Sequence, residues 1–98
     1  MSMHYIDIGP SPYDEECVNV GEDDYTRRAL QECRRFILLL REVLGPEPEG
    51  ARLTVRAFPH DFGDYYEVVC TFDPTLPASL AYAMRCEAEC PAHWEDRA

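Results

Sequence analysis

The amino-acid sequence predicts an α+β fold, a two-layer sandwich in which an antiparallel sheet carries both of its helices on one face. Two observations lead to this class. Residues 52–72 hold two runs of alternating apolar and polar residues around a turn-rich centre, as a β-hairpin does. One segment before this hairpin and another after it repeat apolar residues at helical intervals. With 98 residues, the chain is expected to form one domain, residues 1–98.

The beginning of the chain predicts a short strand. Ile6 and Ile8 alternate with Asp7 before a Gly-Pro pair ends the run. Residues 17–20 favour another short strand, and the acidic, proline-containing stretch between the two is typical of a surface loop.

A helix is predicted between Asp23 or Asp24, either of which can cap its first turn, and the Gly-Pro pair at residues 45–46. Its apolar stripe comprises Ala29, Leu30, Cys33, Phe36, Ile37, Leu40, Val43 and Leu44. Leu38 and Leu39 exceed what one stripe needs. They indicate either a helix that is buried on two sides or a patch for a partner or a second copy of the chain.

The hairpin predicts a buried face and an open face. The residues expected in the core are Leu53, Val55 and Ala57 in the first arm and Tyr66, Val68, Cys70 and Phe72 in the second. The opposite face would present Arg52, Arg56, Tyr65 and Glu67, enough aromatic and arginine content for a contact surface. The connection over residues 59–64 is longer than a tight hairpin turn needs.

The second helix is expected to begin near Pro77, with Asp73 or Thr75 as its cap, and to stop at Cys90 and Pro91. Its predicted inner face contains Leu80, Ala83 and Met84.

Charge is the most informative property of the sequence. Nineteen acidic residues against nine basic ones give a net charge of −10, and all nine basic residues are arginines. A field of this sign repels nucleic acid and anionic membranes and attracts cationic surfaces. The expected partner is therefore a protein with a basic, nucleic-acid-binding surface, whereas direct binding to nucleic acid or to a membrane is not expected.

Several classes of protein are disfavoured. No apolar run approaches the ~18 residues of a membrane-spanning helix, and the first residues do not form a secretory signal, so a cytoplasmic location is expected. Five cysteines form an odd set and favour reduced thiols. Cys86, Cys90 and His93 resemble part of a zinc site but leave its fourth ligand missing, so neither a metal nor a cofactor is expected.

Catalysis has one candidate, His60 with Asp61 and Asp64, which could serve a small metal-dependent hydrolase. The embedded Asp-Phe-Gly is the magnesium-binding element of protein kinases, but this chain has neither their glycine-rich loop nor a lysine. A turn explains the segment better, since aspartate and glycine favour turns. The chain is not expected to be an enzyme.

One pattern resembles that of a family of small uncharacterised bacterial proteins. It covers about the last three-quarters of the chain, and the resemblance implies a shared fold without indicating an activity. Its elements are His60 to Gly63, Tyr65 or Tyr66 with Glu67 and Val68, Asp73, Tyr82 with Ala83, and Pro91 to Trp94.

These observations favour an acidic protein-binding module that mimics nucleic acid, similar in size and charge to phage-encoded anti-CRISPR and anti-restriction inhibitors. The residues predicted to bind the partner are Asp14, Glu15, Glu16, Glu22, Asp23, Asp24, Asp61 and Asp64. They are expected to form one negative face from the first acidic segment and the hairpin loop. Three alternatives stay open. One is a structural or regulatory domain that self-associates as a homodimer through Leu38, Leu39 and the open sheet face. The others are the small metal-dependent hydrolase and an acidic domain whose charge serves only solubility.

Overall fold

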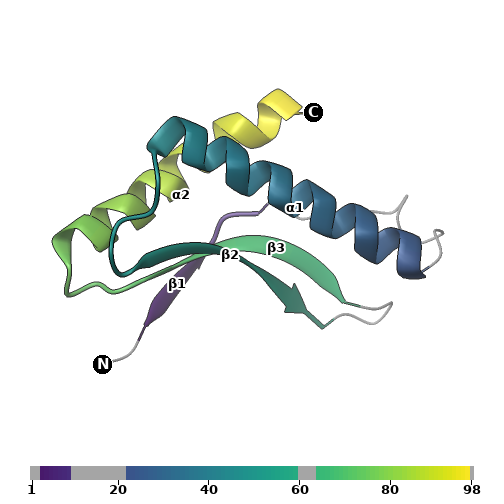
Figure 1. Cartoon of the computed structure of the whole chain (residues 1–98), viewed down its shortest axis with the longest axis horizontal. Helices are drawn as coiled ribbons and strands as arrows, with labels where there is room; N and C mark the ends of the chain where they lie inside the picture. Colours follow the sequence, from purple (N-terminus) through teal and green to yellow (C-terminus); the bar gives the residue numbers. More distant parts are fainter. Residues whose placement is uncertain (1–2, 10–21, 60–63, 98) are drawn as a thin grey trace.

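The fold is given by a computed structural model, which describes residues 3–9, 22–59 and 64–97. Residues 22–25 and 90–97 are described as helical backbone only. Along the described chain run three strands and two helices: β1 (His4–Asp7), α1 (Glu22–Leu44), β2 (Ala51–Phe58), β3 (Tyr65–Phe72) and α2 (Pro77–Arg97). The strands form an antiparallel sheet, and both helices lie on one side of it (Figure 1). The predicted α+β class is confirmed.

β3 is the central strand because it pairs on both sides, giving the order β1-β3-β2. Cys70 lies opposite Ile6 of β1 and Leu53 of β2. The N–H of Ile8 continues the first pairing by donating to the carbonyl of Val68 at 3.0 Å. The third strand matters because an isolated two-stranded hairpin is marginally stable in water. β2 becomes an edge strand in this order. The strand predicted at residues 17–20 lies outside the described residues.

The core lies between the sheet and the two helices. Alternate residues of β3 contribute to it, as predicted, and both helices cover the same sheet face. Its buried members are Ile8, Cys33, Phe36, Leu40, Leu53, Val68, Cys70, Phe72, Tyr82, Ala83 and Cys86. The three cysteines in this set are free thiols, so they act here as small apolar side chains.

Helix α1 begins at Glu22, so Asp23 and Asp24 lie within its first turn instead of preceding it as predicted. Helix boundaries read from sequence commonly differ by this amount, and acidic residues in a first turn still favour the helix dipole. The predicted end is confirmed. Gly45, at a φ of 85°, donates its N–H to the carbonyl of Arg41 at 2.8 Å, as a left-handed C-terminal cap does.

The two extra leucines of α1 differ in their surroundings. Leu39 is half-buried and packs against the core, whereas Leu38 is 58% exposed. Leu30 and Val43, predicted on the apolar stripe, are also exposed. α1 therefore presents apolar side chains to solvent on more than one side.

The loop between α1 and β2 is fastened to the start of α2. The buried hydroxyl of Ser79 accepts the N–H of Asp73 at 2.8 Å and donates to the carbonyl of Gly50 at 3.0 Å. The hydroxyl of Tyr82 donates to the carbonyl of Gly45 at 3.1 Å. These bonds satisfy polar groups that would otherwise be costly to bury.

These hydrogen bonds also explain why the inner face of α2 differs from the predicted one. Leu80 and Met84 were expected in the core but are exposed, while Ser79, Tyr82, Ala83 and Cys86 are buried. Apolar spacing alone could not show that two hydroxyl-bearing residues would find partners in a loop 29 and 37 positions earlier in the chain. Their satisfied hydroxyls allow the helix to turn this face inward.

Both ends of α2 test the sequence prediction. The start at Pro77 is confirmed. Asp73 caps a turn instead of the helix, since its Oδ1 accepts the N–H of Thr75 at 2.9 Å, and the carbonyl of Leu76 accepts the first helical N–H. The predicted stop at Pro91 is wrong, because the helix continues to Arg97. A proline removes one helical hydrogen bond, a local penalty that the surrounding helix overrides here.

Candidate partner-binding surfaces

Most of the predicted acidic site lies outside what the structure describes. Asp14, Glu15, Glu16 and Asp61 belong to segments that are not described, and the side chains of Glu22, Asp23 and Asp24 are not described in the first turn of α1. Asp64 is exposed immediately before β3. Whether the hairpin loop and the first acidic segment form one negative face therefore stays a prediction.

The candidate metal ligands are similarly placed. His60 and Asp61 fall outside the described residues, and so do the side chains of Cys90 and His93. Cys86 is buried in the core. Within residues whose side chains are described, no group of three or more His, Cys, Asp or Glu residues could hold a metal ion.

Most of the net charge lies on residues whose side chains the structure does not describe. Residues with described side chains include ten carboxylates and eight arginines, which leaves −2. The remaining residues include nine carboxylates and Arg97, which supply −8 of the net −10. Of these nine carboxylates, three lie in the first turn of α1 and two in the final turns of α2, so the folded elements carry part of the surplus charge. The other four lie in segments that the structure does not describe.

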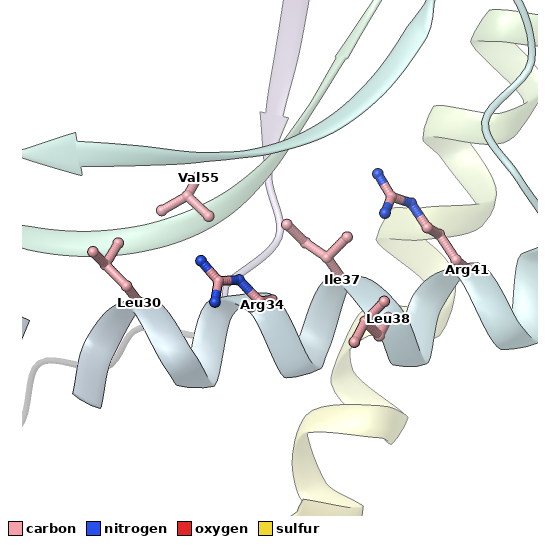
Figure 2. A pocket seen from close by; sticks show the side chains of 6 residues that line it. All are labelled: Leu30, Arg34, Ile37, Leu38, Arg41 and Val55. Atoms are coloured by element: carbon pink, nitrogen blue, oxygen red, sulfur yellow. The ribbon is translucent and has the colours of Figure 1, made fainter. Parts of the chain in front are cut away.

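A groove with positive and apolar character lies between α1 and β2. It has a volume of about 200 Å³ and is lined by Leu30, Arg34, Ile37, Leu38, Arg41 and Val55. Figure 2 shows the two guanidinium groups directed from α1 toward the sheet. Leu30 is 37% exposed and Leu38 is 58% exposed, so apolar surface reaches solvent beside positive charge. Apolar surface with a few placed polar groups is the usual composition of a binding site.

One of these arginines is held by the protein itself. The guanidinium of Arg41 donates to both carboxylate oxygens of Glu47, from Nε at 2.8 Å and from a terminal nitrogen at 2.9 Å. Glu47 also accepts the N–H of Leu53 at 3.2 Å. The hydrogen bonds from Arg41 hold the pKa of Glu47 below its ordinary value. Arg34 has no ion-pair partner among the described residues, so its charge is available in the groove.

The same loop covers part of the free edge of β2. Leu53 donates its N–H to Glu47, and Ala51 donates its N–H to the carbonyl of Pro48 at 3.1 Å. Covering an edge strand with a loop prevents indiscriminate pairing with other strands. This cover ends at Leu53, before the part of β2 that borders the groove.

The open face of the sheet carries an aromatic and arginine cluster. The guanidinium carbon of Arg56 lies 4.3 Å from the ring centre of Tyr5 and 5.8 Å from that of Phe58. The rings of Phe58 and Tyr65 stack with their centres 5.4 Å apart. Contacts of a cation over an aromatic ring contribute about 0.5 to 1 kcal/mol at exposed sites. The predicted presence of Arg56 and Tyr65 on one face is confirmed.

This cluster also explains an unexpected burial. Val69 points to the open face, yet it has 0% exposure. Val69 belongs to the central strand and lies opposite Asp7 of β1 and Thr54 of β2. Tyr5 of β1 and Arg56 of β2 therefore occupy positions diagonal to Val69, one on each side of it. Because Arg56 reaches Tyr5 across the middle strand, the pair lies over Val69. Part of this face is therefore closed by its own side chains.

The sequence interpretation missed the groove, although a signal for it exists. Positions 30, 34, 37, 38 and 41 follow one stripe of a helix, because residues three and four apart share a face. The stripe mixes apolar residues with two arginines. What the sequence does not show is that this stripe borders a free sheet edge.

No protein-family model, curated protein or solved structure matches the chain. No described helix is both long enough and apolar enough to cross a membrane.

Proposed function

We propose that this chain is a small acidic protein-binding module that mimics nucleic acid and blocks a basic, nucleic-acid-binding surface of a partner protein. The division of charge supports the proposal. Residues 10–25, residues 60–63 and the final turns of α2 together supply −8 of the net −10, so the negative charge is concentrated in a few short stretches of the chain. Carboxylates can replace phosphates against arginine and lysine, and a strong negative field accelerates encounter with a basic surface.

The proposed binding residues remain those of the acidic segments: Asp14, Glu15, Glu16, Glu22, Asp23, Asp24, Asp61 and Asp64. Inhibition follows from occupation of the partner's surface, without a catalytic step. The role corresponds to that of an anti-CRISPR-like or anti-restriction-like inhibitor encoded by a phage or another mobile element. Buried free thiols at Cys33, Cys70 and Cys86 suit the reducing cytoplasm in which such a partner would act.

A competition experiment tests the proposal. The immobilised chain is incubated with a bacterial lysate, and the captured proteins are challenged with double-stranded DNA, with RNA, and with increasing salt. Mimicry predicts that one of the nucleic acids displaces the captured protein, because both ligands occupy the same surface. Binding should also weaken steeply with salt, as it does when many charges are neutralised at an interface.

Two triple variants provide the matched comparison. Asp14→Asn, Glu15→Gln and Glu16→Gln together remove three charges from the first acidic segment. Glu42→Gln, Glu49→Gln and Glu87→Gln together remove three charges from exposed positions elsewhere in the described chain. We expect the first variant to lose most of the capture and the second to keep it. An equal loss of capture in both variants would show that only the net charge matters. Capture that neither DNA nor RNA can displace would contradict mimicry.

Self-association is the second candidate, and the exposure of Leu38 favours it. This leucine and Leu30 lie together on α1, where apolar surface could meet a second copy. Sedimentation equilibrium at tens of micromolar distinguishes the candidates. A dimer that dissociates on Leu38→Glu would support self-association, whereas a monomer at these concentrations would exclude it as the role of this surface.

A further inference from the structure

No described strand pairs with the outer edge of β2, where two backbone amides lie next to the groove. The loop before β2 occupies the edge amides of Ala51 and Leu53. Alternate residues of a strand direct their N–H groups to the same side, so the amides of Val55 and Ala57 also point away from β3. The pairing of β2 with β3 runs without interruption from Ala51 to Phe58, so this alternation is maintained. Among the described strands, none lies on that side of β2.

The groove meets this part of the edge. Val55 contributes to both features, since its side chain lines the groove and its amide points to the free edge. Figure 2 shows it facing Leu30 of α1. An added strand would direct alternate side chains toward α1, where Leu30 and Leu38 offer apolar surface. Strand addition to an open edge combines main-chain hydrogen bonds with pockets for alternate side chains in this way.

The positive charge of the groove indicates what kind of ligand it binds. Arg34 has no ion-pair partner in the described structure, and Arg41 is 44% exposed despite its bond to Glu47. Arg34 therefore favours a carboxylate, which can accept its N–H groups in a forked pair, while Arg41 keeps only the donors that Glu47 does not occupy. A second copy of the chain would bring the same arginines to the interface. Nucleic acid would meet the arginines but supplies no extended peptide backbone to the free amides.

We propose that the groove between α1 and the free edge of β2 binds an extended peptide segment in which the alternate residues that face α1 include both acidic and apolar side chains. The segment adds to the sheet as a strand beside Val55 and Ala57. Its apolar side chains contact Leu30 and Leu38, and its carboxylates bind Arg34 and Arg41. This surface differs from the acidic segments of the proposed function, so each proposal stands or fails by itself.

The test uses a synthetic seven-residue peptide, capped at both ends, in which every second position is glutamate or valine in turn and the positions between them are serine, so that glutamate and valine face α1 together. It is titrated into the full ¹⁵N-labelled chain. Amide resonances of Val55 and Ala57 are expected to shift the most, together with those of the α1 stripe. A peptide with lysine in place of glutamate is expected to bind at least tenfold more weakly. Unshifted Val55 and Ala57 amides at millimolar peptide would overturn the proposal.

Neighbouring arginines provide a matched pair of variants. Arg34→Ala is expected to weaken binding about tenfold, the loss that accompanies one hydrogen bond to a charged group. Arg35→Ala removes the same charge one position away, where the guanidinium pairs with Glu32 outside the groove, and is expected to change binding less than about twofold. Equal effects of the two variants would contradict a specific role for the groove.

The backbone and the alternative occupants are tested separately. A peptide N-methylated at the residues that face β2 keeps its side chains and is expected not to bind, and undiminished binding would overturn strand addition. Val55 and Ala57 shifts that vary with protein concentration alone would assign the groove to a second copy. If Asp14→Asn, Glu15→Gln and Glu16→Gln together moved these resonances without peptide, the chain's own acidic segment would be the occupant. Either result would overturn the proposal.

Discussion

Two glycines with almost the same backbone conformation have different reasons to be glycine. Gly45 has a φ of 85° and Gly50 a φ of 90°, a region that side-chain-bearing residues rarely adopt. A Cβ at Gly45 would meet nothing within 4 Å. At Gly50 it would lie 2.7 Å from Cδ1 of Leu76 and 3.3 Å from Cβ of Ser79. Gly45 is required by its backbone alone, and Gly50 by its backbone and by close packing on α2.

This difference predicts unequal costs for the same substitution. Gly45→Ala should lower the free energy of unfolding by about 1 kcal/mol, the cost of backbone strain. Gly50→Ala should lower it by about 2 kcal/mol, because crowding against Leu76 and against Ser79, which is held by its hydrogen bonds, adds to the backbone strain. Urea unfolding followed by circular dichroism measures both values. Equal losses would show that Leu76 and Ser79 relax freely around the new methyl group.

At the scale of elements, Glu47 joins the end of α1 to the start of β2. It accepts two hydrogen bonds from Arg41 and one from the backbone of Leu53, and its side chain is 13% exposed. This arrangement fixes how the helix leads into the edge strand. It also sets one wall of the groove, since Arg41 lines it.

The lowered pKa of Glu47 predicts a pH-dependent contribution to stability. A carboxylate whose folded pKa is below its unfolded value stabilises the fold above the unfolded pKa, here 4.5, and loses this effect as the pH falls through the folded pKa. Glu47→Gln should therefore lower the free energy of unfolding by about 1 kcal/mol at pH 7 and by much less at pH 3.

Urea titrations of the wild type and the variant at both pH values measure this change. Glu49→Gln is the control, because Glu49 is exposed in the same loop and outside the ion pair. A constant difference between wild type and Glu47→Gln from pH 7 to pH 3 would contradict the assigned role of the carboxylate.

At the scale of the whole molecule, the charges proposed for binding are expected to lie apart from the contacts that stabilise the fold. Residues 10–25, residues 60–63 and the final turns of α2 supply −8 of the net −10. A large net charge keeps a protein soluble but opposes compaction through self-repulsion. The acidic segments are therefore expected to contribute little to the stability of the fold.

Neutralising the first acidic segment tests this separation. The combined variant Asp14→Asn, Glu15→Gln and Glu16→Gln should change the free energy of unfolding by less than about 0.5 kcal/mol, as exposed substitutions usually do. Any change should be stabilising at low ionic strength, where self-repulsion is strongest, and should fade with added salt. Thermal unfolding at low and high salt measures it. A loss above about 1 kcal/mol would place these carboxylates among the contacts that stabilise the fold.

Particular residues show how much of the fold could be predicted from the sequence. Alternation at Leu53, Val68, Cys70 and Phe72 predicted the hairpin and its buried face, because the side-chain period of a strand is set by the backbone itself. Local rules failed at Pro91, where a strong stop signal lies inside α2. The acidic site stays a prediction, since Asp14 and Asp61 lie in segments that the structure does not describe.

The sequence by itself determined the class of this fold, the order of its elements and its negative charge. Only the tertiary structure decided that β3 lies in the middle, that β2 lies at an edge, and that Arg34 faces a groove beside free amides. The physical reason is the range of the interactions. Periodicity and capping depend on residues a few positions apart, whereas an edge or a groove depends on which distant segments pair and which surfaces remain uncovered.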